Sequence, residues 1–191
     1  ICGNTDALKA APRASHPSTD MKLGGWIDQA AVAVIFRHRN HGCELFFIQR
    51  AKKPGDPWSG DMAFPGGRKQ IEDATLKDTA IRETWEETGL DLFRHGRFQR
   101  ALSHQLTRSH RSGVPMIVKP HLFYWQGDDD MNLNHECDDA LWIPLAFFND
   151  RSERSSLTWK QGHFSLQLPC YRFGEKTVWG LTLRMLEQIR Q

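Results

Sequence analysis

The apolar residues of this chain gather in short runs, and the first two runs predict a pair of strands. Residues 30–36 (AAVAVIF) and 43–50 (CELFFIQR) are separated by the polar segment RHRNHG. Two short apolar runs joined by a polar turn that contains glycine are typical of a β-hairpin. No apolar run in the sequence approaches the roughly 18 residues that a membrane span needs, so no membrane partner is expected.

The segment 75–88 (TLKDTAIRETWEET) contains no glycine or proline and predicts a helix. Gly89 stands where a helix stop is expected. Before this helix, the Pro/Gly-rich residues 52–67 predict a loop without regular structure. The buried face of the helix is marked by residues at i, i+4 spacing: Leu76, Ala80, Thr84 and Thr88.

Three later segments complete the expected pattern. Residues 114–125 (VPMIVKPHLFYW) predict a strand pair or one strand bent at a proline, and residues 139–148 predict a short strand that runs into a turn or helix. Residues 176–191 predict an amphipathic C-terminal helix. Strands and helices mixed in this way predict one α/β domain over residues 26–191, after a weakly ordered lead-in over residues 1–25.

Composition narrows the classes of partner. The 191 residues are 39% hydrophobic and 25% charged, with a net charge of +2, which is usual for one globular domain. A nearly balanced charge gives no reason to expect nucleic acid, so any anion must bind at a local site. The four cysteines show no CxxC spacing, which argues against a zinc site and fits a reducing compartment. A cytoplasmic location is therefore expected, with a removed targeting peptide left open.

The sequence RETWEETG places Glu83, Glu86 and Glu87 on one face of the predicted helix. Like charges at these spacings repel by roughly 0.2–0.5 kcal/mol per pair, and acids in the second half of a helix also oppose its dipole. The alternative to a binding site is an acidic helix face that is simply exposed to solvent. The preceding FPGG (64–67) favours a binding site, because glycines let the backbone approach a ligand closely. Carboxylates in this number are suitable ligands for Mg²⁺ or Mn²⁺.

The segment GGRKQIEDATLKDTAIRETWEETGL resembles the Nudix box, which is a glycine, five residues, Glu, seven residues and then Arg-Glu-apolar-x-Glu-Glu-x-Gly-apolar. The first half departs from this pattern, because Asp73 replaces the Glu and eight residues separate it from Arg82. Thr84 stands at the apolar position. The second half matches through Arg82, Glu83, Glu86, Glu87, Gly89 and Leu90.

An Asp at this position, followed by one extra residue before the Arg, resembles the pattern of the coenzyme A pyrophosphatase branch of the Nudix hydrolases. Three further segments resemble that branch, although PGDPW stands where the branch usually carries an arginine. The matching residues are Arg50, Gly60 and Phe64–Gly67 in the first segment, Asn134, Glu136, Trp142, Pro144 and Leu145 in the second, and Trp179, Gly180 and Thr182 in the third.

The resemblance implies a Nudix-type α/β/α sandwich with a central mixed sheet, a catalytic loop and helix, and an amphipathic C-terminal helix. It implies hydrolysis of a nucleoside diphosphate linked to another group, with coenzyme A or acyl-CoA as the expected substrate and Mg²⁺ or Mn²⁺ as the cofactor. Nucleotide sugars, ADP-ribose and nucleoside triphosphates are alternative substrates. A ligand-binding module without catalysis is an alternative from another class.

The resemblance also assigns expected roles. The metal ligands are Glu83, Glu86, Glu87 and the Gly67 carbonyl group, with Arg82 holding the carboxylates and Asp73 supporting the loop. The general base is Glu83 or Glu136, and these alternatives remain open.

Substrate-binding residues are expected at Gly66, at Arg50, which reaches a phosphate or pairs with a carboxylate, and in the basic segment 103–113. That segment carries Arg108 and Arg111 and is either a phosphate clamp or a solvated loop. The expected partner is a small nucleotide substrate, and a homodimer is left open.

Overall fold

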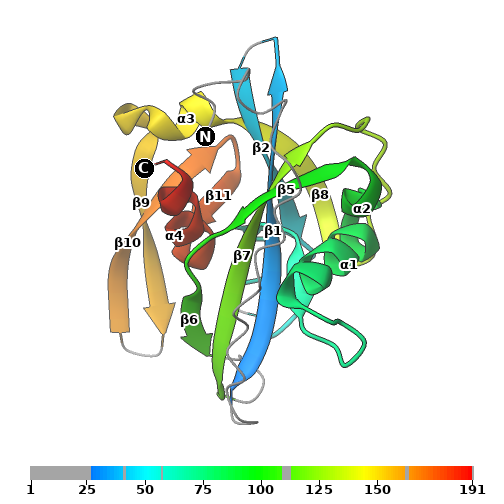
Figure 1. Cartoon of the computed structure of the whole chain (residues 1–191). Helices are drawn as coiled ribbons and strands as arrows, with labels where there is room; N and C mark the ends of the chain where they lie inside the picture. The colour runs from blue at the N-terminus through cyan, green and yellow to red at the C-terminus, as the bar shows by residue number, and fades with distance from the viewer. Residues whose placement is uncertain (1–26, 41, 57, 109–112, 162–163, 191) are drawn as a thin grey trace.

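The computed structural model describes residues 27–40, 42–56, 58–108, 113–161 and 164–190. The lead-in predicted for residues 1–25 lies outside this part of the chain. Strands cross the centre of the molecule, with α1 on one side and α4 on the other (Figure 1). The strands of the main sheet are β1 (Asp28–Arg39), β2 (Gly42–Arg50), β3 (Met62–Ala63), β4 (Gly66–Arg68), β5 (Gly96–Ala101), β6 (Gln105–Arg108), β7 (Pro115–Trp125) and β8 (Cys137–Pro144).

The main sheet is mixed. Its order is β3-β2-β1-β7-β5, with β4 also paired to β1, β6 to β7 and β8 to β2. β1 and β7 are parallel, whereas the other pairs are antiparallel. The predicted hairpin is confirmed by β1 and β2, which pair from Phe36↔Leu45 to Arg39↔Gly42. The predicted segment 114–125 is one strand, β7.

The alternation of residues along β1 divides the core into two layers. Val34 and Phe36 point into one buried cluster, whereas Ala33 and Ile35 point into the other. Successive side chains of a strand face opposite sides of the sheet, so a strand buried on both faces is apolar throughout. This pattern explains the run AAVAVIF and produces the two covered faces of an α/β/α sandwich.

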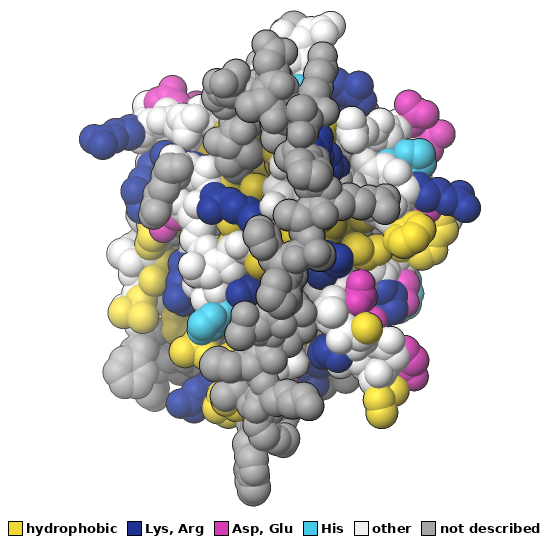
Figure 2. All heavy atoms as spheres, viewed as in Figure 1, with side chains coloured by type: hydrophobic (Ala, Val, Ile, Leu, Met, Phe, Trp, Pro, Cys, Tyr) yellow, Lys and Arg dark blue, Asp and Glu magenta, His cyan; other side chains and the backbone are white. Residues whose placement is uncertain are grey.

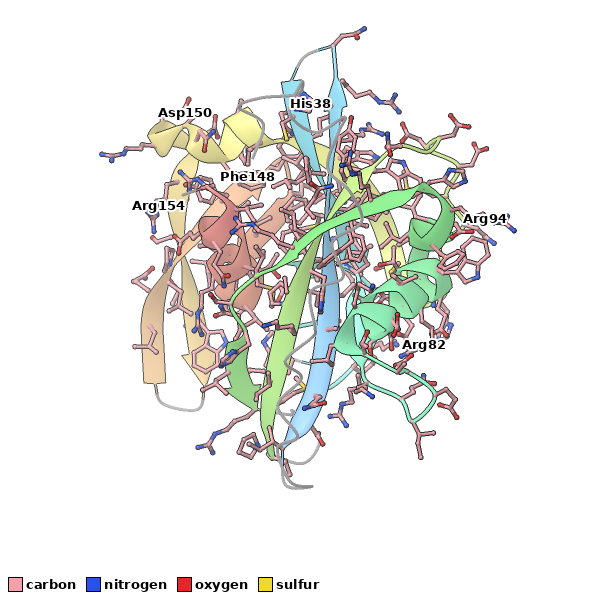
Figure 3. The ribbon with its side chains drawn as sticks, viewed as in Figure 1. His38, Arg82, Arg94, Phe148, Asp150 and Arg154 are labelled. Atoms are coloured by element: carbon pink, nitrogen blue, oxygen red, sulfur yellow. The ribbon has the colours of Figure 1, made fainter. Side chains whose placement is uncertain are left out.

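Helices cover both faces. α1 and α2 (Leu92–His95) pack on the layer that contains Ala33, while α4 packs on the layer that contains Val34. Phe148 of α3 points into the layer that contains Val34 and is fully buried (Figure 3). The other helices are α1 (Leu76–Thr88), α3 (Leu145–Asn149), the 3₁₀ turn Arg151–Glu153 and α4 (Gly180–Ile189).

Three sequence-based expectations are corrected. The segment 52–67 was expected to lack regular structure, but β3 and the start of β4 lie within it because their backbones pair with β2 and β1. The C-terminal helix begins at Gly180, since residues 176–179 form strand β11. The segment 103–113 contains β6, which pairs with β7 from Gln105↔Val118 to Arg108↔Pro115.

A second sheet was missed altogether. It has the order β11-β10-β9, formed by β9 (Arg154–Gln161), β10 (Phe164–Phe173) and β11 (Lys176–Trp179). β9 alternates polar and apolar residues weakly, and most of its described side chains are exposed. Its strand conformation is therefore determined by pairing with β10 rather than by a buried face of its own.

Candidate active site

The site is built where the glycine loop, residues 60–67, returns beside β1. Gly66 pairs with Val32 and has a φ of +154°, a conformation that favours glycine. A Cβ atom on Gly66 would lie 2.2 Å from the Ala31 carbonyl oxygen, so no larger residue fits without displacing the backbone. The Pro65 carbonyl oxygen accepts a 2.8 Å hydrogen bond from the Ala33 N–H. The loop is thus held tightly against the sheet.

α1 has well-defined ends, which fix the positions of its acids. Thr75 and Asp78 form a reciprocal capping box at its start, and Gly89, with a φ of +74°, ends it. Thr84 and Thr88 are fully buried, and their hydroxyl groups donate to the carbonyl oxygens of Ala80 and Thr84. This bonding explains how threonine occupies the apolar position of the box.

Glu87 points inward from α1 and is only 7% exposed. Its carboxylate accepts a 2.9 Å hydrogen bond from the Gly66 N–H. Burial raises the pKa of Glu87 to about 8; the Gly66 hydrogen bond opposes this shift, while the charges of Glu83 and Glu136 add to it. Within the described part of the chain, no basic side chain forms an ion pair with Glu87. Its negative charge is therefore poorly compensated by the protein.

Glu83 lies against the backbone of Gly67. A Cβ atom on Gly67 would come within 2.5 Å of the Glu83 carboxylate carbon, so the missing side chain leaves the space that this carboxylate fills. Burial raises the pKa of Glu83, although its ion pair with Arg82 lowers it and the charges of Glu86 and Glu136 raise it further. The acid and the glycine are thus matched in space.

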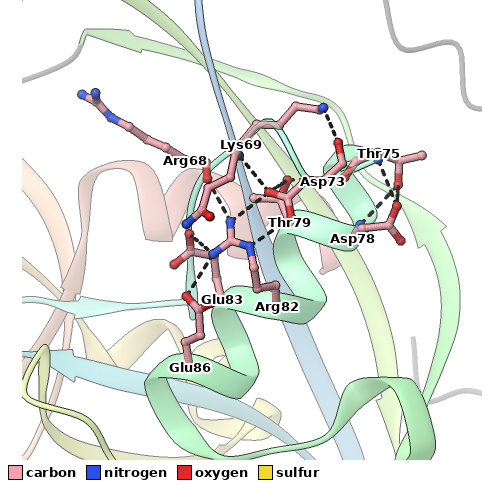
Figure 4. Close-up of polar contacts among 10 residues, drawn as sticks. Arg68, Lys69, Asp73, Thr75, Asp78, Thr79, Arg82, Glu83 and Glu86 are labelled. Atoms are coloured by element: carbon pink, nitrogen blue, oxygen red, sulfur yellow. Dashed lines mark hydrogen bonds and ion pairs between the residues drawn. The ribbon is translucent and has the colours of Figure 1, made fainter.

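Arg82 connects the acids of α1 to the loop before the helix (Figure 4). One side of its guanidinium group forms two 2.9 Å hydrogen bonds with the Asp73 carboxylate. Its Nη1 donates to both Glu83 and Glu86, each at 2.9 Å. Figure 3 shows Arg82 projecting from α1 towards this loop. The structure therefore places Arg82 among the carboxylates, as the resemblance implies.

Asp73 is buried beneath this ion-pair network. It accepts hydrogen bonds from the Gln70 N–H and the Thr79 hydroxyl, in addition to the two from Arg82. The Arg82 hydrogen bonds hold the pKa of Asp73 well below its usual range. Gln70 belongs to the loop between β4 and α1, whereas Thr79 and Arg82 belong to α1, so Asp73 joins this loop to the helix.

Glu136 approaches the acids from another segment. Its charge adds to the raised pKa values of Glu83 and Glu87. The segment that carries it is fastened to the end of α1, because the Asn132 and Asn134 N–H groups donate to the Thr88 and Glu87 carbonyl oxygens at 2.9 and 3.1 Å. Glu136 is half exposed and forms a 3.3 Å ion pair with Lys53.

The predicted substrate residues are not all brought together. Arg50 lies near Glu87, whose pKa it lowers, and forms a 2.7 Å ion pair with Asp56. Arg108 is exposed at the end of β6. β6 is separated from β4 by β7 and β1, so three strand spacings, or about 14 Å, lie between β6 and the glycine loop. Arg111 lies outside the described residues.

The donor chemistry fits a hard divalent cation. Glu83, Glu86 and Glu87 offer carboxylate oxygens, and the buried, poorly compensated Glu87 is stabilised by added positive charge. In the described residues, however, no group of three or more His, Cys, Asp or Glu side chains is already arranged to hold a metal ion. Arg82 stands between Glu83 and Glu86. Metal binding would therefore require these two carboxylates to turn away from Arg82.

On the face drawn in Figure 2, Lys and Arg side chains are visible on both the left and the right of the molecule, and Asp and Glu side chains lie mostly on the right. Over the part of the chain that the structure describes, no helix is long and apolar enough to cross a bilayer.

Comparison with known proteins decides the family. A family model described as the NUDIX domain matches residues 27–161. The chain belongs to the Nudix family. The predicted Nudix-type α/β fold is thereby confirmed.

The Nudix chain is similar to two curated proteins of other organisms. It is 29% identical over 149 residues to the Mus musculus protein named mitochondrial coenzyme A diphosphatase NUDT8, which covers 75% of this chain and 67% of the relative. It is 35% identical over 105 residues to uncharacterized protein C14C4.10c of Schizosaccharomyces pombe, which covers 53% of this chain and 32% of that protein. The chain thus spans only about a third of the fission yeast protein.

The Nudix fold is also found in the NUDIX domain of Shewanella oneidensis NrtR complexed with ADP ribose. The TM-score is 0.60 at 16% identity, and the alignment covers 91% of this chain and 92% of that domain. At this identity the likeness concerns the fold alone.

Sequence reasoning missed several polar residues of the site. Lys53 forms an ion pair with Glu136, the Asn132 N–H donates to the Thr88 carbonyl oxygen, and the Gln49 side chain donates to the Gly60 carbonyl oxygen. Lys52 and Lys53 were visible as a basic pair after a predicted strand, but nothing local placed them opposite Glu136.

Proposed function

We propose that this Nudix protein is a metal-dependent diphosphatase that hydrolyses coenzyme A or acyl-CoA to 3′,5′-ADP and 4′-phosphopantetheine or its acyl derivative. The observation that carries the proposal is the contact between the glycine loop and α1: Gly66 donates to Glu87, and Gly67 leaves the space for the Glu83 carboxylate. This contact concentrates acidic oxygens beside the backbone of the glycine loop, where they would hold the cations that a diphosphate needs.

The chemistry needs charge compensation at the diphosphate. Bound divalent cations neutralise the phosphate oxygens and make water more acidic. Glu83, Glu86, Glu87 and the Gly67 carbonyl oxygen are the proposed ligands, while the Arg82 hydrogen bonds to Asp73 hold α1 to the loop that precedes it. A water oxygen forms a bond to one phosphorus atom as the bridging P–O bond breaks, and the bridging oxygen leaves on the other phosphate.

We assign proton acceptance from the water to Glu136. Glu83 is a proposed metal ligand, whereas Glu136 is half exposed and is not among the proposed ligands. Lys53 and Arg50 lie nearby and supply positive charge for the substrate phosphates. A Glu136→Gln variant tests this assignment, because a residual turnover equal to that of the wild type would reject it.

The coenzyme A assignment is supported by the branch resemblance and by the name of the mouse relative. ADP-ribose is a second candidate substrate, since it too is a nucleoside diphosphate linked to another group. The predicted cytoplasmic location stays a prediction; the mouse relative is named a mitochondrial enzyme, and fractionation of the source cells would separate the two.

A substrate panel tests the function directly. Coenzyme A, acetyl-CoA, ADP-ribose, NADH and dGTP are incubated with the protein and Mg²⁺ or Mn²⁺, and the products are separated by chromatography. We expect the highest kcat/KM on coenzyme A or acetyl-CoA. A higher value on ADP-ribose would select the second candidate, and no turnover of any substrate would favour a ligand-binding module.

A further inference from the structure

The last part of the chain, residues 164–190, lies beyond the family match, which ends at residue 161. It forms β10, β11 and α4. Six of its side chains are buried in the layer of the core that contains Val34: Tyr171, Val178, Leu183, Met185, Leu186 and Ile189. Burial of so many side chains fixes this segment relative to the main sheet. β11 also lies against β3, which belongs to the glycine loop.

Lys176 at the start of β11 reaches the main sheet. Its ammonium group donates a 2.7 Å hydrogen bond to the Gln49 side-chain oxygen and forms a 2.6 Å ion pair with Asp139. Gln49 and Asp139 face each other as register partners on β2 and β8. Lys176 therefore binds across one pair of strands at a point 127 residues away from Gln49 in the chain.

Gln49 carries this connection to the glycine loop. Its side-chain nitrogen donates a 3.2 Å hydrogen bond to the Gly60 carbonyl oxygen. The neighbouring Arg50 closes the base of the loop, since its N–H donates to the Asp61 carbonyl oxygen and its carbonyl oxygen accepts from the Gly60 N–H. The same loop continues to Gly66, whose N–H binds Glu87.

Asp139 carries the connection to the other side of the site. It lies three residues after Glu136 on the segment that enters β8. The Glu136 carbonyl oxygen accepts a 2.8 Å hydrogen bond from the Ala51 N–H, so this segment and the start of the loop are already joined. Asp61 makes a further polar contact with the Trp179 side chain, from the end of the same strand as Lys176.

The contacts of Lys176 with Gln49 and Asp139 contribute little to the free energy of folding. The Asp139 side chain is 47% exposed, and ion pairs that solvent reaches stabilise proteins only weakly. Lys176 has two partners at short distances, one hydrogen-bonded to the glycine loop and the other three residues after Glu136, and this arrangement suits the fixing of geometry.

We propose that Lys176 is a positioning residue: by binding Gln49 and Asp139 together, it holds the glycine loop and the Glu136 segment at a fixed separation beside α1. This inference rests on the proposed function of that site. It assigns a role to the C-terminal hairpin, which completes the active site from outside the family match.

The test compares Lys176→Met, which keeps the aliphatic stem, with Lys176→Arg, which keeps a cation. Asp139→Asn is a second, more conservative variant in case Lys176→Met does not fold. Arg172→Met is the matched control, because Arg172 lies on the paired strand β10 and contacts only the Ser156 carbonyl oxygen among the hydrogen bonds described. The readouts are kcat, KM and hydrogen exchange of the backbone amides in residues 58–68 and 134–140.

In Lys176→Met we expect faster amide exchange in both segments and a fall in kcat of about tenfold or more, as for residues that orient catalytic ligands. KM should change much less, and Lys176→Arg should restore most of the protection and turnover. Arg172→Met should behave as the wild type.

Unchanged exchange and unchanged kcat in Lys176→Met would overturn the proposal. Faster exchange with an unchanged kcat would also overturn it, because the residue would then be purely structural. If the wild type hydrolyses none of the panel substrates, the proposed function fails; exchange alone then judges whether Lys176 holds the two segments.

Discussion

The backbone N–H of Gly66 donates a 2.9 Å hydrogen bond to the carboxylate of Glu87, which closes the glycine loop onto α1. A buried carboxylate with one backbone donor and no basic partner among the described side chains is costly unless a cation joins it. This hydrogen bond thus connects the glycine loop to the acids of α1.

Replacing Glu87 with Gln should separate function from folding. The amide can still accept the Gly66 hydrogen bond and avoids burying a charge, so the melting temperature without metal should stay equal or rise. Turnover should fall by at least about 100-fold, because charge that holds the cation is lost.

Metal titration adds a readout that is independent of activity. Saturating Mn²⁺ should raise the melting temperature of the wild type, since a ligand at 100 times its Kd stabilises by about 2.7 kcal/mol. The rise should be much smaller in Glu87→Gln and unchanged in Glu72→Gln, which alters an exposed acid of the preceding loop. A folded Glu87→Gln protein with normal turnover would refute the metal assignment.

Gly67→Ala should impair activity more than stability. The added Cβ atom would displace the Glu83 carboxylate, which is the flexible end of a side chain, so we expect a stability loss of only about 0.5–1.5 kcal/mol. Turnover should fall by roughly 10–100-fold because the carboxylate leaves its position. Denaturant unfolding and steady-state kinetics measure the two effects. Gly174→Ala is the control for the kinetic measurement, because nothing lies within 4 Å of the Cβ atom added at this turn. Its turnover should equal that of the wild type.

Asp73→Asn should weaken the protein at neutral pH and flatten its response to acid. The Arg82 hydrogen bonds lower the pKa of Asp73 in the folded state, so its stabilisation is complete above the unfolded pKa of about 3.9 and is lost as the pH falls below that value. The free energy of unfolding at pH 7 should drop by about 1–3 kcal/mol, the cost of unsatisfied buried donors.

The measurement is urea unfolding from pH 7 to pH 3. The stability difference between wild type and Asp73→Asn should narrow over the acid part of this range. Asp130→Asn, which alters an exposed carboxylate, should parallel the wild type throughout. A constant difference at every pH would mean that folding does not lower the pKa of Asp73.

A phosphate clamp at Arg108 predicts a preference between two related substrates. Wild type should favour coenzyme A over dephospho-coenzyme A by roughly tenfold or more, since ~1.4 kcal/mol corresponds to that factor and a charged hydrogen bond contributes at least as much. Arg108→Ala should remove the preference while activity on the dephospho form stays intact. Arg100→Ala, an exposed arginine of β5, is the control. Equal rates on both substrates in the wild type would reject the clamp.

The sequence by itself determined the elements whose signals are local. The spacing of Leu76, Ala80, Thr84 and Thr88, with Gly89 after them, predicts α1 to within one residue at its N-terminal end. The runs 30–36 and 43–50 predict β1 and β2, because apolar period and turn residues act over a few positions. The box acids were identifiable for the same reason.

Only the tertiary structure decided which groups meet. The sequence places Glu83, Glu86 and Glu87 on one face but does not say that Glu87 is buried while Glu86 is 47% exposed. It also gives no sign that Lys176 binds Gln49 or that β9 and β10 pair. Burial and pairing of this kind depend on segments that are distant in the chain, and their energy appears only when the sheet and both layers of the core assemble.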